Sequence, residues 1–157
     1  MVKQSFDIEV GIAAGEERHA EKIARFQVDM AMESEGLVLD YERVSTGVRA
    51  VLADEAKGRY IIAQMGEEVV GCLMITREWS DWNGCWYWWI QSVYVVPEHR
   101  GRGIYKAMYN KVLDLAKSAG VCQIRLYVDK NNAAAQTVYQ KLGMAECYYS
   151  LYEKVLN

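Results

Sequence analysis

The sequence predicts an α/β (α+β) fold in which one mixed β-sheet is flanked by about four helices. In the first half, apolar segments separated by short turns are typical of neighbouring strands. In the second half, helix and strand alternate, which favours helices packed on that sheet. A chain of 157 residues can bury a sizeable core as one domain, which we expect to span residues 1–157.

The N-terminal third is expected to contain one strand and two helices. The strand covers residues 6–13, and a helix follows from about Glu16. The apolar stripe of that helix consists of Ile23, Phe26 and Met30. Asp40 is a favourable N-cap for a second helix. The apolar side of the second helix consists of Val44, Val48, Val51 and Leu52.

Three strands are predicted in the middle of the chain. Residues 59–65 and 69–79 are rich in β-branched and apolar residues and are separated by a tight turn. A second turn, "DWNG" at residues 81–84, leads into "CWYWWIQSVYVV" at residues 85–96. This segment is apolar on both faces, so we expect it inside the sheet and not at its edge.

The second half contains two helices and the last strands. The first helix keeps an apolar period of 3.6 through Ile104, Met108, Val112, Leu115 and Ala119. "VCQIRLYV" at residues 121–128 reads as a strand. A helix follows with asparagine at its start and Gly143 as its stop. Residues 144–156 alternate loosely, which predicts one or two final strands.

Composition excludes several classes of protein. The net charge of −3 gives no sign of a nucleic-acid partner, and no apolar run is long enough to span a membrane. Without a signal-peptide core at the N-terminus, we expect a cytoplasmic protein. The cysteines have no CxxC spacing, so buried free thiols are expected at Cys72, Cys85, Cys122 and Cys147. His19, expected on a helix surface, and His99 are too far apart for a zinc site, so no metal is predicted.

Basic residues gather in one stretch of this mildly acidic chain, "HRGRGIY" at residues 99–105. A strand precedes the stretch and a helix begins within it. The first N–H groups of a helix have no intrahelical partners, and the helix dipole favours an anion there. Glycines at Gly101 and Gly103 let the backbone approach that anion closely. The stretch therefore predicts a phosphate-binding turn, although it matches neither GxxxxGK[ST] nor GxGxxG.

The turn resembles motif A of the GCN5-related N-acetyltransferases, the GNAT superfamily. Arg100, Gly103 and Tyr105 stand at the three marked positions of that motif, and Pro97 precedes them in its usual place. Downstream, "VDKNNAAAQTVYQKLGM" resembles the motif B of the same family. The matching positions in motif B are Asn132, Ala135, Tyr139, Leu142 and Gly143.

The resemblance implies the GNAT fold, a mixed and mostly antiparallel sheet splayed between strands 4 and 5. It also implies acetyl-coenzyme A as cofactor, with its pantetheine arm in the splay and its pyrophosphate on the basic turn. The cofactor-binding residues implied are Val93, Tyr94, Val95, Arg100, Gly101, Arg102, Gly103, Ile104, Tyr105 and Asn132.

The resemblance further implies an N-acetyltransferase in which an amine attacks the thioester directly. Tyr139 is the implied catalytic acid, because a phenol can donate a proton to the departing thiolate at neutral pH. A backbone N–H near Val95 is expected to polarise the thioester carbonyl. Tyr105 departs from the glycine or alanine of motif A. Some family members carry a glutamate on strand 4, where this chain has Trp89 or Gln91. A base would therefore come from Glu33, Glu78 or Asp81 through water, whereas an amine that arrives already neutral needs no base.

Carboxylates beside aromatic rings suggest a small cationic amine as the acceptor. The residues expected to bind it are Glu33, Trp82, Trp89 and Gln91. A protein N-terminus or lysine is the alternative acceptor. An acyl-coenzyme A sensor that transfers nothing is the alternative of another class, favoured by Tyr105 and the missing strand-4 carboxylate. Neither a nucleic acid nor a membrane is expected as partner, and "CYYSLYEKV" offers an interface for a homodimer by analogy with the family.

Overall fold

The computed structural model of the chain describes residues 9–156. Contacts divide the chain into two compact units, one ending at Leu126 and the other beginning at Tyr127. The first unit contains the sheet and helices α1, α2 and α3, and the second contains helix α4. The expectation of one domain over residues 1–157 stays a prediction.

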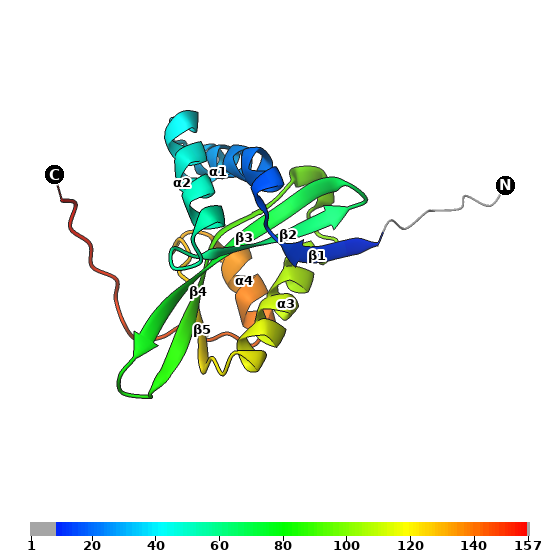
Figure 1. Cartoon of the computed structure of the whole chain (residues 1–157). Coiled ribbons are helices and arrows are strands. Elements are labelled where there is room, and N and C mark those ends of the chain that lie inside the picture. Colours follow the sequence, from blue (N-terminus) through cyan, green and yellow to red (C-terminus); the bar gives the residue numbers. More distant parts are fainter. Residues whose placement is uncertain (1–8, 157) are drawn as a thin grey trace. The chain divides into compact units, whose positions relative to one another are not determined.

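The sheet has five strands in the order β1-β2-β3-β4-β5 (Figure 1). The four strands that pair antiparallel are β1 (Val10–Ala14), β2 (Arg59–Met65), β3 (Glu68–Ser80) and β4 (Cys85–Val95). The fifth, β5 (Gln123–Arg125), runs parallel to β4. A mixed, mostly antiparallel sheet is therefore confirmed, and β4 lies inside it as predicted. Residues 6–8 of the first predicted strand lie outside the described residues.

Both helices of the first half form where they were predicted. A 3-10 turn, η1 (Glu17–His19), leads into α1 (Ala20–Glu35), and α2 covers Tyr41–Ala53. The predicted cap of α2 is confirmed, because the Asp40 carboxylate accepts the Glu42 N–H at 2.9 Å. A second 3-10 turn, η2 (Pro97–His99), precedes α3 (Ile104–Ser118). Within residues 9–156, none of the helices has the length and apolar character needed to cross a membrane.

The helices α1 and α2 cover one face of the sheet and α3 covers the other (Figure 1). Alternation along each strand divides the core, so Tyr60 and Ile62 of β2 contact the α1 and α2 side. Fully burying an aliphatic side chain contributes about 1.5–3 kcal/mol. The side chains that are fully buried include Ile23, Ile61, Ile62, Leu73, Met108 and Val112.

Strand β4 is paired on both edges for only part of its length. Parallel pairing with β5 is confined to three residue pairs and ends at Trp89↔Arg125. The strand continues to Val95 with β3 along one edge and no β5 residue along the other. This confirms the splay predicted between strands 4 and 5, and β5 is shorter than the predicted strand 121–128.

The second unit is built around α4 (Ala133–Lys141). Asn132 caps its first turn by accepting the Ala135 N–H at 3.0 Å, and Gly143 ends it at φ +85°. The prediction of final strands in residues 144–156 is wrong, since no strand forms there. Strand formation requires a ladder partner, and this unit offers no second strand. The tyrosines of this stretch are exposed instead.

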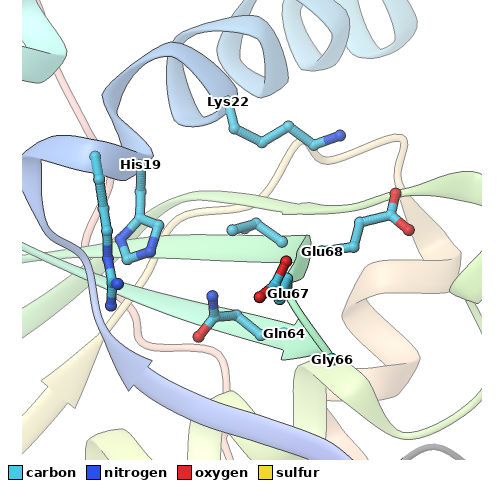
Figure 2. Close-up of a pocket in the computed structure, with 8 residues that line it drawn as sticks. His19, Lys22, Gln64, Gly66, Glu67 and Glu68 are labelled. Atoms are coloured by element: carbon cyan, nitrogen blue, oxygen red, sulfur yellow. The ribbon is translucent and has the colours of Figure 1, made fainter.

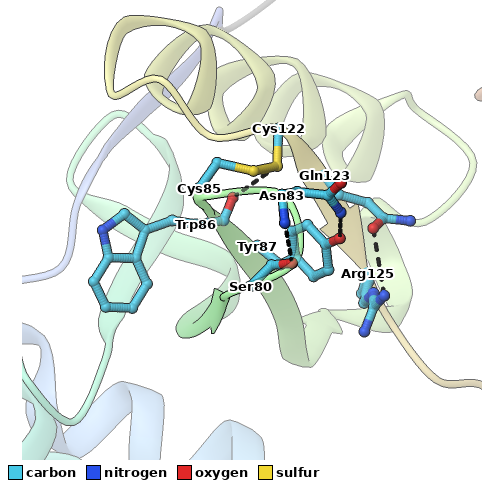
Figure 3. Close-up of a disulfide and its surroundings, with 8 residues drawn as sticks. All are labelled: Ser80, Asn83, Cys85, Trp86, Tyr87, Cys122, Gln123 and Arg125. Carbon is cyan, nitrogen blue, oxygen red and sulfur yellow. Dashed lines mark hydrogen bonds between the residues drawn. A yellow bond between two sulfur atoms is a disulfide. The ribbon is translucent and has the colours of Figure 1, made fainter.

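The prediction of four buried free thiols is wrong at three positions. Cys85 and Cys122 form a disulfide that links the start of β4 to the residue before β5 (Figure 3). Beside the disulfide, the Cys122 N–H donates to the Trp86 carbonyl at 3.0 Å. Pairing of these two chain segments brings the sulfurs together, and the spacing of cysteines in the sequence does not reveal such pairing. Cys147 is free but exposed, and only Cys72 is the buried free thiol that was expected.

Removing the disulfide in a Cys85→Ala/Cys122→Ala variant should lower the free energy of unfolding. The bond spans 37 residues, and constraining a loop of that length in the unfolded chain contributes about 4 kcal/mol. Urea unfolding of the two proteins without reductant measures the difference. Cys147→Ala is the matched control and should leave stability unchanged. Equal stability of the double variant and the oxidised wild type would contradict the expectation.

Candidate functional site

The basic turn between β4 and α3 presents several backbone N–H groups. Gly101 and Gly103 have φ of +74° and +79°, and Gly103 is the N-cap of α3. A Cβ on either glycine would meet no atom within 4 Å, so the conformation and not crowding requires glycine. Within the described part of the chain, the N–H groups of Gly101, Arg102, Gly103 and Ile104 donate to no acceptor.

These N–H groups form the kind of site that binds a phosphate. They converge at the start of a 15-residue helix, where the dipole favours negative charge. The open space in front of both glycines leaves room for the anion. A pyrophosphate therefore fits the turn, and the residues in contact with it would be Gly101, Arg102, Gly103 and Ile104.

Arg100 is engaged with the protein and does not extend into the open space of the turn. Its Nε donates to the Val95 carbonyl at 2.8 Å, and its guanidinium pairs with Glu33 at 2.7 Å. The same Glu33 carboxylate accepts the Tyr94 hydroxyl at 3.2 Å. Burial first, and then the Glu33 charge, raise the pKa of Tyr94 to about 12, so this hydroxyl remains a donor. The cluster ties the end of β4 to the last turn of α1.

The other basic and aromatic residues of the turn lie around its rim. Arg102 is exposed and donates to Nδ1 of His99 at 3.5 Å. Tyr105, which replaces the expected glycine or alanine, is half-buried, with its ring 6.1 Å from that of Tyr109. Its side chain therefore lies along α3, while its position leaves the glycine backbone accessible.

A β-bulge interrupts β4 just before the turn. Cys72 pairs with Tyr94 and Met74 pairs with Gln91, so Ser92 and Val93 together lie opposite one residue, Leu73. Ser92 has a φ of +53°, which is uncommon for a residue with a Cβ. No sequence signal marks this bulge, because glycine would be the usual residue in that conformation.

The sheet face toward α1 and α2 carries the predicted pair Trp89 and Gln91. Both lie on β4 at the same face, and Gln91 donates to the hydroxyl of Thr76. Trp89 donates from Nε1 to Glu78 at 2.6 Å, and Arg125 lies 3.3 Å from the same carboxylate. The Arg125 guanidinium also lies 4.3 Å from the Tyr87 ring centre. A carboxylate, two aromatic rings and a cation are thus gathered on one face.

The structure does not gather all the predicted acceptor residues. Trp82 is 89% exposed in the β3–β4 turn, whereas Trp89 lies within β4. Glu33 belongs to the Arg100 cluster at the other end of β4. Of the three proposed sources of a base, only Glu78 adjoins Trp89, because Asp81 lies in the exposed turn after β3.

The two predicted residues of motif B lie in the second unit. The Asn132 side-chain oxygen is already used as the cap of α4. Tyr139 lies on α4, and burial raises the pKa of its hydroxyl. A raised pKa keeps the phenol protonated, which a proton donor requires.

Sequence reasoning missed two polar groups that face the β4 bulge. Gln27 of α1 is buried, and its side-chain amide donates to Sγ of Cys72 at 3.6 Å. The Cys72 thiol in turn donates to the Ser92 carbonyl at 3.8 Å. A glutamine on the buried side of an amphipathic helix was the one available signal.

A polar cavity of about 500 Å³ lies between the start of α1 and the β2–β3 turn (Figure 2). Its lining consists of Arg18, His19, Lys22, Gln64, Gly66, Glu67, Glu68 and Val69. His19, expected on the surface, is buried, because its Nδ1 accepts the Glu16 N–H at 2.9 Å and draws the ring inward. None of the predicted site residues lines this cavity.

Comparison with known proteins identifies a family model that matches most of the chain, curated relatives that match part of it, and solved structures that match nearly all of it. The model of the acetyltransferase (GNAT) family matches residues 21–144. Thialysine N-epsilon-acetyltransferase of Bos taurus is 36% identical over 78 residues, which are 50% of this chain and 45% of that protein. The chain therefore spans less than half the length of this curated relative.

Solved structures share the fold over nearly the full length. The crystal structure of a possible acetyltransferase from Clostridium difficile 630 is 37% identical, with a TM-score of 0.88. The superposition covers 94% of this chain and 98% of that one. The structure of AAC(6')-Iy in complex with the bisubstrate analogue CoA-S-monomethyl-acetylneamine has a TM-score of 0.75 at 16% identity. The superposition covers 95% of this chain and 99% of that one and shows the same fold.

The buried His19 should make stability depend on pH in a defined direction. Burial, and then the charge of Arg18, lower the pKa of His19 below 6.5 in the folded chain. Just below pH 6.5 the unfolded chain therefore binds a proton at His19 more strongly than the folded chain does. The contribution is present above about pH 6.5 and is lost as the pH falls through the lower pKa of the folded state. Urea unfolding at pH 7.5, 6.5 and 5.5 should show a steeper loss for the wild type than for His19→Asn. Parallel losses would contradict a neutral buried His19.

Proposed function

Because the chain belongs to the GNAT family of acetyltransferases, we propose that it transfers an acetyl group from acetyl-coenzyme A to a small cationic amine. The observation that carries this proposal is the turn between β4 and α3. Two glycines at positive φ and an uncovered helix start lie beside an open strand edge and would bind a pyrophosphate. An acyl-coenzyme A presents both a pyrophosphate and an extended amide-bearing arm, so it matches both features.

The backbone would hold the donor through two sets of groups. The N–H groups of Gly101, Gly103 and Ile104 would bind the pyrophosphate, with Arg102 adding charge at the rim. The open edge of β4, from Val93 to Val95, would bind the extended arm as a further strand does. The Val95 carbonyl is already bonded to Arg100, so Val93 offers more of its backbone to the arm.

Two groups of this chain would assist the transfer. The thioester supplies the carbonyl that the amine attacks, and negative charge builds on that oxygen. We assign the N–H that stabilises this charge to the bulge, at Val93, two residues before the position expected from the sequence. Tyr139 would protonate the departing thiolate, consistent with the raised pKa of its phenol.

The cluster around Glu78 supports a cationic acceptor. Its carboxylate adjoins Trp89 and Arg125, and the Arg125 guanidinium stacks on Tyr87. These surroundings already accommodate one cation, and cation–π contacts contribute about 0.5–2 kcal/mol. We therefore assign Glu78, on β3, as the group that binds the ammonium group of the acceptor and then accepts its proton. A strand-4 glutamate has this role of general base in some relatives.

Two other functions make different predictions for turnover. A protein N-terminus or lysine as acceptor requires a peptide to be consumed faster than a small diamine. An acyl-coenzyme A sensor requires binding without release of thiol in the presence of any amine. The Glu78 carboxylate and the rings of Trp89 and Tyr87 on the same sheet face favour the small cationic amine over both.

Acetyl-coenzyme A should stabilise the wild type against thermal unfolding. At 100 times its dissociation constant the gain is about 2.7 kcal/mol. Gly103→Glu should abolish the shift, because it places a carboxylate and a strained residue in the phosphate turn. Gly120→Glu is the matched control, with φ of +67° and open space at its Cβ, and should retain the shift. A comparison with coenzyme A that lacks its 3′-phosphate tests whether the protein binds that group. If millimolar acetyl-coenzyme A gave no thermal shift, acetyl-coenzyme A would be excluded as the donor.

Tyr139→Phe should lower kcat by at least about 100-fold, the lower range for loss of a general acid. Thiol release is measured with a panel of diamines, monoamines and an N-terminal peptide, and diamines should react fastest. The thermal shift with acetyl-coenzyme A should be kept. Tyr152→Phe, at a tyrosine that is 91% exposed, should retain full activity. An unchanged kcat in Tyr139→Phe would remove this residue from the reaction.

A further inference from the structure

Three polar groups from three elements form a chain of hydrogen bonds at the β4 bulge, in which Gln27 and Cys72 are buried and Ser92 is partly buried. The Gln27 side-chain amide of α1 donates to Sγ of Cys72 on β3 at 3.6 Å. The Cys72 thiol donates to the Ser92 carbonyl on β4 at 3.8 Å. Cys72 is fully buried and Gln27 is 8% exposed, so water does not compete for these groups. A glutamine amide in such a position needs a partner, and the thiol provides it.

The Cys72 thiol is the side-chain donor to the Ser92 carbonyl, at the point where the bulge interrupts the register of β3 and β4. Ser92 and Val93 have no paired residue in the register of β3. A partly buried carbonyl is more stable when it accepts a hydrogen bond from the protein. The thiol supplies one from the side chain of a neighbouring strand.

The direction of the Ser92 carbonyl also determines where the next N–H points. The described chain has no cis peptide bond, and in a planar trans peptide the C=O and the following N–H point in opposite directions. Since the Ser92 carbonyl faces Cys72, the Val93 N–H faces away from Cys72. Fixing one end of this peptide therefore fixes the other.

The thiol remains a donor over the whole range of physiological pH. Burial raises the pKa of Cys72 to about 12, so the sulfur keeps its proton. The Gln27 amide donates to the sulfur lone pair, which leaves the S–H directed at the Ser92 carbonyl. Gln27 thus orients the thiol, and the thiol orients the peptide.

We propose that Cys72, oriented by Gln27, is a positioning residue that holds the Ser92–Val93 peptide so that the Val93 N–H faces the reacting thioester carbonyl. This inference rests on the proposed acetyl transfer. It assigns a role to a buried cysteine that does not itself touch the donor or the amine. The thiol acts only by its hydrogen bond, and no covalent step passes through the sulfur.

A cysteine that only fills space in the core would behave differently on substitution. Serine and alanine are of similar size, and both leave part of the sulfur volume empty. Serine keeps a donor for Ser92, whereas alanine removes it. For a space-filling role, Cys72→Ala should be the better tolerated variant, since a buried hydroxyl is costly. For a positioning role, Cys72→Ser should be the better enzyme.

The test compares Cys72→Ala with Cys72→Ser in the full chain. With saturating acetyl-coenzyme A and amine, kcat should fall about tenfold or more in Cys72→Ala and less than about threefold in Cys72→Ser. Both decreases are smaller than the decrease caused by complete loss of one oxyanion donor. The KM for the amine should stay within about twofold in both. Gln27→Met should lower kcat in the same direction by a smaller factor. Ile62→Val, which removes one methyl group from a fully buried core side chain, controls for lost stability and should leave kcat unchanged.

A second measurement reads the peptide itself and needs no turnover. The ¹H–¹⁵N resonance of Val93 should be displaced in Cys72→Ala and retained in Cys72→Ser before any ligand is added. Addition of acetyl-coenzyme A should shift this resonance in the wild type and in Cys72→Ser, and much less in Cys72→Ala. Equal kcat values and equal Val93 resonances in the two variants would overturn the positioning role. A wild type that shifts Val93 but acetylates no amine would instead overturn the proposed function.

Discussion

The architecture of the site depends on the unequal pairing of β4. One edge of this strand is bonded to β3 along nearly its whole length, while the other is bonded to β5 only as far as Trp89. Beyond that point the strand has an edge that a ligand can use. A fully paired β4 would offer no backbone group for binding, and an unpaired one would not hold its shape.

Both ends of β4 are fixed, which makes the open edge a stable feature. At its start, the Cys85–Cys122 disulfide and the Cys122 N–H hold β5 against β4. At its end, Arg100 bonds to the Val95 carbonyl and to Glu33 of α1. Between them, the bulge is backed by Cys72 and Gln27. The strand is therefore held at three places while its outer edge stays accessible.

The two faces of the sheet carry different kinds of side chains. The face toward α3 is filled by aliphatic packing, whereas the face toward α1 and α2 carries Glu78, Trp89 and Arg125 beyond the region that the helices cover. Polar groups at such a place are costly unless they are paired, and each of these has a partner. This separation allows a cluster of charged and aromatic side chains, the proposed acceptor site, to exist beside a well-packed core.

The sequence by itself determined most of the elements and the glycine turn between β4 and α3. Periodicity located α2, α3, α4, the Asp40 cap and β2 to within a residue or two, because these depend on local capping and on side-chain alternation. The helix α1 begins at Ala20, four residues after the predicted Glu16, because a 3-10 turn precedes it. "HRGRGIY" predicted the turn, since positive φ at its glycines is a local requirement. Tertiary structure decided what depends on contacts between distant segments. Three such contacts join residues from different elements: the Cys85–Cys122 bond, the Cys72–Ser92 contact and the pairing of Arg100 with Glu33. The burial of His19 likewise depends on packing in the folded chain. Residues 144–156 form no strand because that unit contains no ladder partner for them.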